Sequence, residues 1–223
     1  MPIIAIANPK GGAGKSTLAL VVATTLVHTG QTVAIIDADP NRTIDHWATG
    51  HSQFKPTVIA NATDTSIIGM IRDAAKSHAF VIIDLEGVAS VLVSRAISRA
   101  DLVLIPLRGS SIDARQAARA VQLIRDEEES YGRKIPFSIV MTCTSPLIST
   151  RIEKEIVAEI KAAGFPVAIN HLYDRAAFRA MFRLQQALPE LDPAQVNGLE
   201  AASRNALHLV GEIAQLLIQR EAA

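Results

Sequence analysis

The feature that most constrains this chain is a glycine-rich segment, residues 8–17, that lies between two apolar runs. The run before it, residues 3–7, has the composition of a buried strand, and the run after it, residues 18–23, belongs to a helix. Glycines let the backbone turn tightly and point successive N–H groups at phosphate oxygens, and the helix adds the positive end of its dipole. A strand, a glycine loop and a helix in this order predict a phosphate-binding loop.

Two side chains at the end of this loop have the chemistry that a bound nucleotide requires. Lys15 can reach the β- and γ-phosphates, and the Ser16 hydroxyl can ligate Mg²⁺. The usual P-loop pattern has a further glycine where this chain has Pro9, so the strict pattern fails at one position. A simple glycine turn is the alternative, but it leaves the lysine and serine unexplained.

The remaining apolar runs indicate a parallel sheet. Of the 223 residues, 49% are hydrophobic and only 4% are aromatic, which is typical of aliphatic strands buried between helices. Further strands are expected at residues 32–36, 57–60, 80–84, 101–106, 135–142 and 167–170. Further helices are expected at residues 44–47, 64–77, 112–130 and 150–163. This alternation predicts a single α/β domain, residues 1–223, with a mostly parallel sheet, helices on both faces and ligands at the carboxyl ends of the strands.

The last stretch of the chain is expected to form one long helix. Its apolar residues recur at helical spacing and form one stripe, made of Ala206, Leu209, Val210, Ile213, Leu216 and Leu217. We expect this stripe to dock on the sheet.

Acidic residues end two of the predicted strands. Asp37 and Asp39 follow the second strand, and Asp84 closes the strand at residues 80–84. An aspartate at the end of an apolar strand is the Walker B arrangement, which holds Mg²⁺ directly or through water. We expect Asp84 to serve the metal, Asp37 to support Ser16 and the waters of the metal, and Asp39 to orient the attacking water. The alternative for each is an aspartate that caps a helix or forms a turn.

Charge, cysteine content and hydropathy exclude several classes of protein. The 22 basic residues balance the 22 acidic ones, so binding to nucleic acid requires a local patch. The single cysteine, Cys143, rules out an internal disulfide or a cysteine cluster for zinc or iron–sulfur within one chain. No leader segment and no membrane-spanning run is evident, so we expect a cytoplasmic protein.

Together these segments resemble the ParA/MinD family of deviant Walker ATPases. The resemblance rests on residues 10–17, on residues 37–40 and on the Asp84 strand end, and it spans nearly the whole chain. It is closest to the small ParA partition ATPases, and it implies a P-loop ATPase with ATP and Mg²⁺ as cofactors and weak basal hydrolysis. Two departures are Leu85-Glu86-Gly87, where small or proline residues are more usual, and Asn41, where glutamine is common.

The resemblance also implies roles for individual residues. It implies that Lys10 acts in trans, reaching the ATP of a second subunit as an arginine finger does, so that ATP joins two copies face to face. A solvated surface lysine is the alternative. The implied catalytic residues are Lys10, Lys15 and Asp39. The implied nucleotide-binding residues are Lys10, Gly11, Gly12, Ala13, Gly14, Lys15, Ser16, Thr17, Thr142 and Asp174, the last two as contacts of the base.

A basic stripe is the candidate DNA-binding surface. Arg175, Arg179 and Arg183 follow one another at four-residue steps on one predicted helix face. Resemblance to ParA proteins implies that they contact DNA phosphates without sequence preference; a solvated helix face is the alternative. The implied partners are a second copy of the chain, non-specific DNA and a centromere-binding or cargo-adaptor protein, but no membrane.

The function expected from the sequence is ATP-driven partition or positioning of a plasmid or other cargo, with the ATP-bound form on the nucleoid. One alternative is an accessory ATPase of conjugative DNA processing. Others are a MinD-like ATPase that cycles on membranes, which requires a terminal amphipathic helix, and a metabolic P-loop enzyme.

Overall fold

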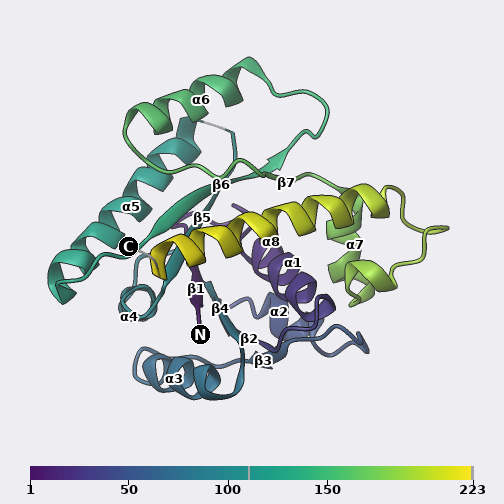
Figure 1. Ribbon diagram of the computed structural model, residues 1–223, viewed down its shortest axis with the longest axis horizontal. Coiled ribbons are helices and arrows are strands. Elements are labelled where there is room, and N and C mark those ends of the chain that lie inside the picture. Colours follow the sequence, from purple (N-terminus) through teal and green to yellow (C-terminus); the bar gives the residue numbers. More distant parts are fainter. Residues whose placement is uncertain (110, 222–223) are drawn as a thin grey trace.

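The computed structural model describes residues 1–109 and 111–221, which form a central sheet covered by helices on both faces (Figure 1). The sheet has seven strands in the order β3-β2-β4-β1-β5-β6-β7, and every pair of neighbours is parallel. The strands are β1 Ile3–Ile6, β2 Val33–Ala38, β3 Thr57–Ile59, β4 Phe80–Leu85, β5 Leu102–Leu107, β6 Phe137–Thr144 and β7 Leu172–Tyr173. The predicted α/β fold with a parallel sheet is therefore confirmed.

Two apolar layers hold the helices on the sheet. Successive residues of a strand point to opposite faces, so Ile4 and Ile6 of β1 belong to one buried cluster and Ala5 to the other. The first cluster contains α1, α2, α7 and α8, and the second contains α3, α4, α5 and α6. The helices are α1 Lys15–His28, α2 Thr43–Trp47, α3 Ile67–Ser77, α4 Val91–Ile97, α5 Ser111–Tyr131, α6 Arg151–Ala162, α7 Ala176–Leu184 and α8 Leu199–Glu221, with a 3₁₀ turn η1 at Leu188–Glu190.

The long C-terminal helix α8 buries the predicted stripe. Ala206, Leu209 and Ile213 are nearly inaccessible to solvent and share a cluster with residues of β5, β6 and α1. In Figure 1 this helix crosses the sheet beside α1. No helix among residues 1–109 and 111–221 combines the length and the apolar content needed to cross a bilayer.

Two expectations about individual elements are wrong, and one helix was not predicted. The strand expected at residues 167–170 lies instead at Leu172–Tyr173, and Val167 forms only an isolated bridge to Ile139. The reason is a competing acceptor on α8: the N–H groups of Ile169 and Asn170 donate to the Glu212 carboxylate at 2.7 and 2.8 Å.

The other two differences concern helices. Helix α3 begins at Ile67, not at residue 64, because Thr63 and Ser66 bond to each other's backbone N–H and hold a turn before the helix. The short helix α4, Val91–Ile97, was not predicted; the Ser90 hydroxyl caps it by accepting from the N–H of Val93 at 3.3 Å.

Candidate nucleotide-binding site

The glycine loop lies between β1 and α1, at the carboxyl edge of the sheet. Gly12 and Gly14 have φ angles of 75° and 91°, a region that other residues rarely adopt. Gly14 is also the residue that precedes α1, so the first N–H groups of that helix face the loop. These two glycines make the tight turn that the sequence predicts.

Asn8, which the sequence did not single out, fixes the start of this loop. Its side-chain amide donates to the Pro106 carbonyl of β5 at 2.6 Å, and its side-chain oxygen accepts from the N–H of Lys10 at 2.9 Å. Because Asn8 is only 2% exposed, the loop is anchored on the neighbouring strand from within the protein.

Lys15 is held inside the loop. Its Nζ donates to the carbonyl of Lys10 at 3.2 Å, and the side chain is largely buried. Burial lowers the pKa of Lys15, while Asp84, Asp39 and Glu86 act in the opposite direction. A cation in this position, close to three carboxylates, can exchange a carbonyl oxygen for phosphate oxygens when a nucleotide enters.

Asp84 is the group in the site that most needs a partner. It lies at the end of β4, paired in register with Ile6 of β1 on one side and Asp37 of β2 on the other. It is fully buried, and neither carboxylate oxygen has a hydrogen-bond partner of normal geometry in the described part of the chain. Burial raises the pKa of Asp84 to about 7; the nearby Ser16 hydroxyl and Lys15 lower it, and Asp37 and Asp39 raise it.

These residues fit a Mg²⁺ ion that arrives with a nucleotide. Mg²⁺ prefers oxygen ligands and is usually held by one or two protein groups together with phosphates and water. The unpartnered Asp84 carboxylate and the Ser16 hydroxyl supply such oxygens. Among the described residues no three histidine, cysteine or acidic side chains cluster as a metal site.

Asp37 has a local task in the structure. Its carboxylate accepts hydrogen bonds from the backbone N–H groups of Ile44 and Asp45 at 3.0 and 2.8 Å, which caps the start of α2. Burial raises the pKa of Asp37, and these backbone bonds lower it. Asp37 thus acts as a capping aspartate, which was the alternative noted from the sequence. Its support of the metal stays a prediction.

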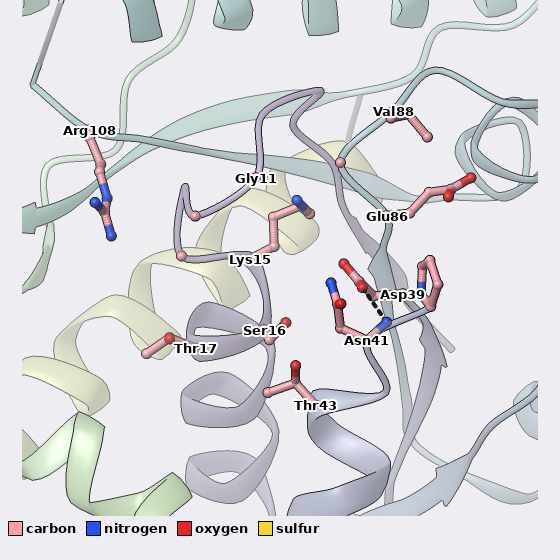
Figure 2. A pocket seen from close by; sticks show the side chains of 14 residues that line it. Gly11, Lys15, Ser16, Thr17, Asp39, Asn41, Thr43, Glu86, Val88 and Arg108 are labelled. Carbon is pink, nitrogen blue, oxygen red and sulfur yellow. Dashed lines mark hydrogen bonds between the residues drawn. The ribbon is translucent and has the colours of Figure 1, made fainter.

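A cavity of about 480 Å³ lies over the loop, and part of the predicted set of site residues lines it, whereas Asp37 and Asp84 are not among its lining residues (Figure 2). Gly11, Gly12, Gly14, Lys15, Ser16, Thr17 and Asp39 line it. Residues that sequence reasoning did not assign to the site also line it: Thr43, Glu86, Gly87, Val88 and Arg108. Two features of the sequence could have assigned Arg108 and Glu86 to the site: both are charged, and both directly follow a strand.

Gly87, in the loop after β4, lies against the phosphate-binding loop. A Cβ added at this position would lie 3.1 Å from the backbone nitrogen of Gly11 and 3.3 Å from Nζ of Lys15. The loop after β4 therefore packs directly on the phosphate-binding loop, and only glycine allows this approach without a shift.

Lys10 takes part in the loop through its backbone. Its N–H donates to Asn8 and its carbonyl accepts from Lys15. The described residues that line the cavity do not include Lys10. Its action on the nucleotide of a second subunit stays a prediction.

The two residues expected to contact the base lie in different environments. Thr142 is buried, and its hydroxyl donates to the carbonyl of Ala13 at 2.8 Å, so it pins the glycine loop to β6. Asp174 is exposed at the end of β7, where its carboxylate pairs with Arg179. Contact of either residue with a base stays a prediction.

The structure divides the predicted arginine stripe. Arg179 and Arg183 are exposed on α7 and line one groove of about 370 Å³ together with residues 195–197. Arg175 precedes the helix, and its guanidinium lies over the Tyr173 ring, 5.5 Å from the centroid. The described part of the chain thus presents two of the three arginines on a common surface.

The fold and the site define a P-loop ATPase of the ParA/MinD type. The family comparison is more specific: a family model described as VirC1 protein matches residues 1–209, and the chain belongs to this family.

Other known proteins are similar to this chain in sequence or in fold. The chain is 42% identical over 207 residues to Protein ParA of Rhizobium radiobacter, covering 92% of this chain and 93% of that protein. It is 25% identical over 181 residues to maintenance of carboxysome distribution protein A of Halothiobacillus neapolitanus, covering 79% and 81% of the two chains. The fold matches the Cyanothece McdA(D38A)-ATP complex with a TM-score of 0.72 at 15% identity, over 96% of each chain.

Proposed function

We propose that this chain is a partition or positioning ATPase that binds Mg²⁺-ATP, forms an ATP-dependent dimer, and releases its partners on hydrolysis. The observation that carries the proposal is Asp84, a buried carboxylate beside Ser16 and Lys15 whose oxygens have no hydrogen-bond partner of normal geometry among the residues that the structure describes. Burying such a group is costly unless a partner compensates it, and a Mg²⁺ ion on a triphosphate is that partner. The 42% identity to a protein named ParA supports partition as the task.

The residues divide the work of phosphoryl transfer. The N–H groups of the glycine loop and the Lys15 ammonium bind the phosphates, and Ser16 and Asp84 hold the metal, which neutralises charge on the phosphoryl oxygens. Asp39 lines the cavity on the acidic side, where it can orient the attacking water. Lys10 of a second copy supplies a further cation, and a site without that cation hydrolyses ATP slowly.

Three substitutions test this division, with Lys76→Ala on the exposed face of α3 as the matched control. Lys15→Ala is expected to abolish ATP binding. Asp39→Ala is expected to bind ATP and form the dimer but to hydrolyse poorly. Lys10→Ala is expected to bind ATP and remain a monomer in light scattering. An Asp39→Ala variant with unchanged turnover, or a dimeric Lys10→Ala variant, would contradict the assigned roles.

DNA binding is proposed for the groove that holds Arg179 and Arg183. Two arginines per copy bind phosphates weakly, but a dimer presents four, and joined sites gain avidity. Four phosphate contacts predict that log K falls with log[salt] with a slope of about −4. The expected form is sequence-independent binding that requires ATP and places the ATP-bound protein on the nucleoid.

The test is a filter-binding titration on random duplex DNA at several salt concentrations. Arg179→Ala combined with Arg183→Ala is expected to lose binding while ATP-dependent dimerisation remains. Arg204→Ala, at an exposed arginine of α8, is the matched control. Binding to liposomes instead of DNA would favour the membrane-cycling alternative.

A second candidate function is favoured by the VirC1 family match over residues 1–209. In this case the ATPase assembles on a particular DNA site as an accessory of conjugative DNA processing. Competition distinguishes the two: random DNA displaces a partition ATPase from any probe, whereas it leaves a site-specific complex intact. A stimulatory cargo adaptor is expected in the first case, with release from DNA on hydrolysis.

A further inference from the structure

Arg108 places a second cation at the nucleotide cavity. It follows β5 directly and lines the same cavity as the glycine loop. In Figure 2 its guanidinium lies on the opposite side of that loop from Asp39 and Glu86, on the side toward which Thr17 points. The cavity therefore has an acidic wall at one end and an arginine at the other.

The backbone on both sides of Arg108 is held by packing. Leu107 before it is fully buried in β5. Gly109 after it lies so close to α6 that an added Cβ would be 2.5 Å from Cγ of Glu153. Glu153 cannot easily give way, because its carboxylate accepts from the N–H of Thr150 at 3.0 Å in the capping box of α6. The fold thus fixes where the side chain of Arg108 starts.

Arg108 has no acidic partner in the described part of the chain, whereas several other exposed arginines have one. Arg42 and Arg151 each lie 2.7 Å from a carboxylate, and Arg179 pairs with Asp174. Arg108 makes no ion pair or hydrogen bond with any described residue, although it is exposed at a polar cavity. An arginine presents a planar fork of donors that binds phosphate oxygens in pairs.

We propose that Arg108 binds the nucleotide held in its own subunit, at the phosphate farthest from the metal. This inference rests on the proposed function, because it requires a nucleotide on the glycine loop. Lys15 serves the β- and γ-phosphates, and Arg108 lies on the side of the loop opposite Asp39 and Glu86, so the phosphate nearest Arg108 is the α-phosphate. That phosphate is present in both ATP and ADP, so Arg108 binds both nucleotides.

The experiment measures ADP affinity by calorimetry for Arg108→Gln, Arg108→Lys and the matched control Arg204→Gln. Loss of a charge-assisted hydrogen bond predicts ADP binding weaker by about 10- to 100-fold for Arg108→Gln. Arg108→Lys is expected to fall between this variant and the wild type, since a lysine keeps the charge but not the fork. Arg204→Gln is expected to bind ADP as the wild type does.

The outcomes separate this inference from the proposed function. If the wild type and Arg108→Gln bind ADP with equal affinity, the inference is overturned, but the nucleotide site itself is not. Unchanged ADP affinity together with lost ATP-dependent dimerisation would also overturn it, because the arginine would then serve the second subunit. A wild-type protein that binds neither ADP nor ATP would overturn the proposed function and this inference together. Thermal unfolding of the nucleotide-free variants, expected to be unchanged at an exposed position, controls for folding.

Discussion

Replacing Asp84 with asparagine should stabilise the nucleotide-free protein at alkaline pH while removing its response to Mg²⁺-ATP. The carboxyl is fully buried, and burial raises its pKa from 3.8 to about 7. The folded protein therefore holds this proton more tightly than the unfolded chain does. The stability that the protonated carboxyl contributes is complete below pH 3.8, decreases as the pH rises and is lost once the pH passes 7.

The size of the effect follows from the two pKa values. A shift of about three units corresponds to about 4 kcal/mol between the limiting pH values. Between pH 5 and pH 8, the free energy of unfolding is expected to change by about 2.5 kcal/mol of this total. An asparagine has no proton to lose, so Asp84→Asn lacks this part of the pH dependence.

The assay is urea unfolding of both proteins at pH 5 and pH 8, without nucleotide and with a chelator. The free energy of unfolding of the wild type should fall by about 2.5 kcal/mol more than that of Asp84→Asn. Asp126→Asn, the same chemical change at an exposed position of α5, should behave as the wild type. Mg²⁺-ATP should raise the stability of the wild type only. Parallel pH profiles for wild type and Asp84→Asn would refute the reasoning.

Three further substitutions test contacts around the site. Thr142→Val leaves the Ala13 carbonyl without its donor, so we expect a loss of about 1–3 kcal/mol in urea unfolding and weaker ATP binding, both restored by Thr142→Ser. Trp47→Phe removes the N–H that donates to the Met181 carbonyl at 3.0 Å inside the core. We expect the free energy of unfolding to fall by the same amount, and an unchanged midpoint of urea unfolding would contradict a buried hydrogen bond here. Burial lowers the pKa of His171, so the unfolded chain takes up a proton at this residue before the folded protein does. The stability of the wild type should therefore fall below pH 6.5, whereas the melting temperature of His171→Gln should depend less on pH.

Much of the site could be predicted because it depends on contacts between residues that are close together in the sequence. The turn at Gly12 and Gly14, the helix that begins at Lys15, and the strand that ends at Asp84 each depend on a short pattern. Parallel strands then bring their carboxyl ends to one edge, which is why the loop and Asp84 were expected together.

Other features depend on contacts between segments far apart in the chain. Ile169 gives its N–H to Glu212, 43 residues away, and this contact prevents the strand that its own sequence favours. Arg175 leaves the basic stripe because the Tyr173 ring lies beside it. Arg108 gains its place at the cavity because Gly109 packs on α6.

By itself, the sequence determined that this chain forms a phosphate-binding loop on a parallel sheet, because hydrophobic periodicity and glycine conformation act locally. The tertiary structure alone decided which charged side chains face the cavity and which carboxylates are already engaged, as Asp37 is by the start of α2. The physical reason is that burial and hydrogen bonding depend on neighbours in space, and a single sequence does not state which neighbours those are.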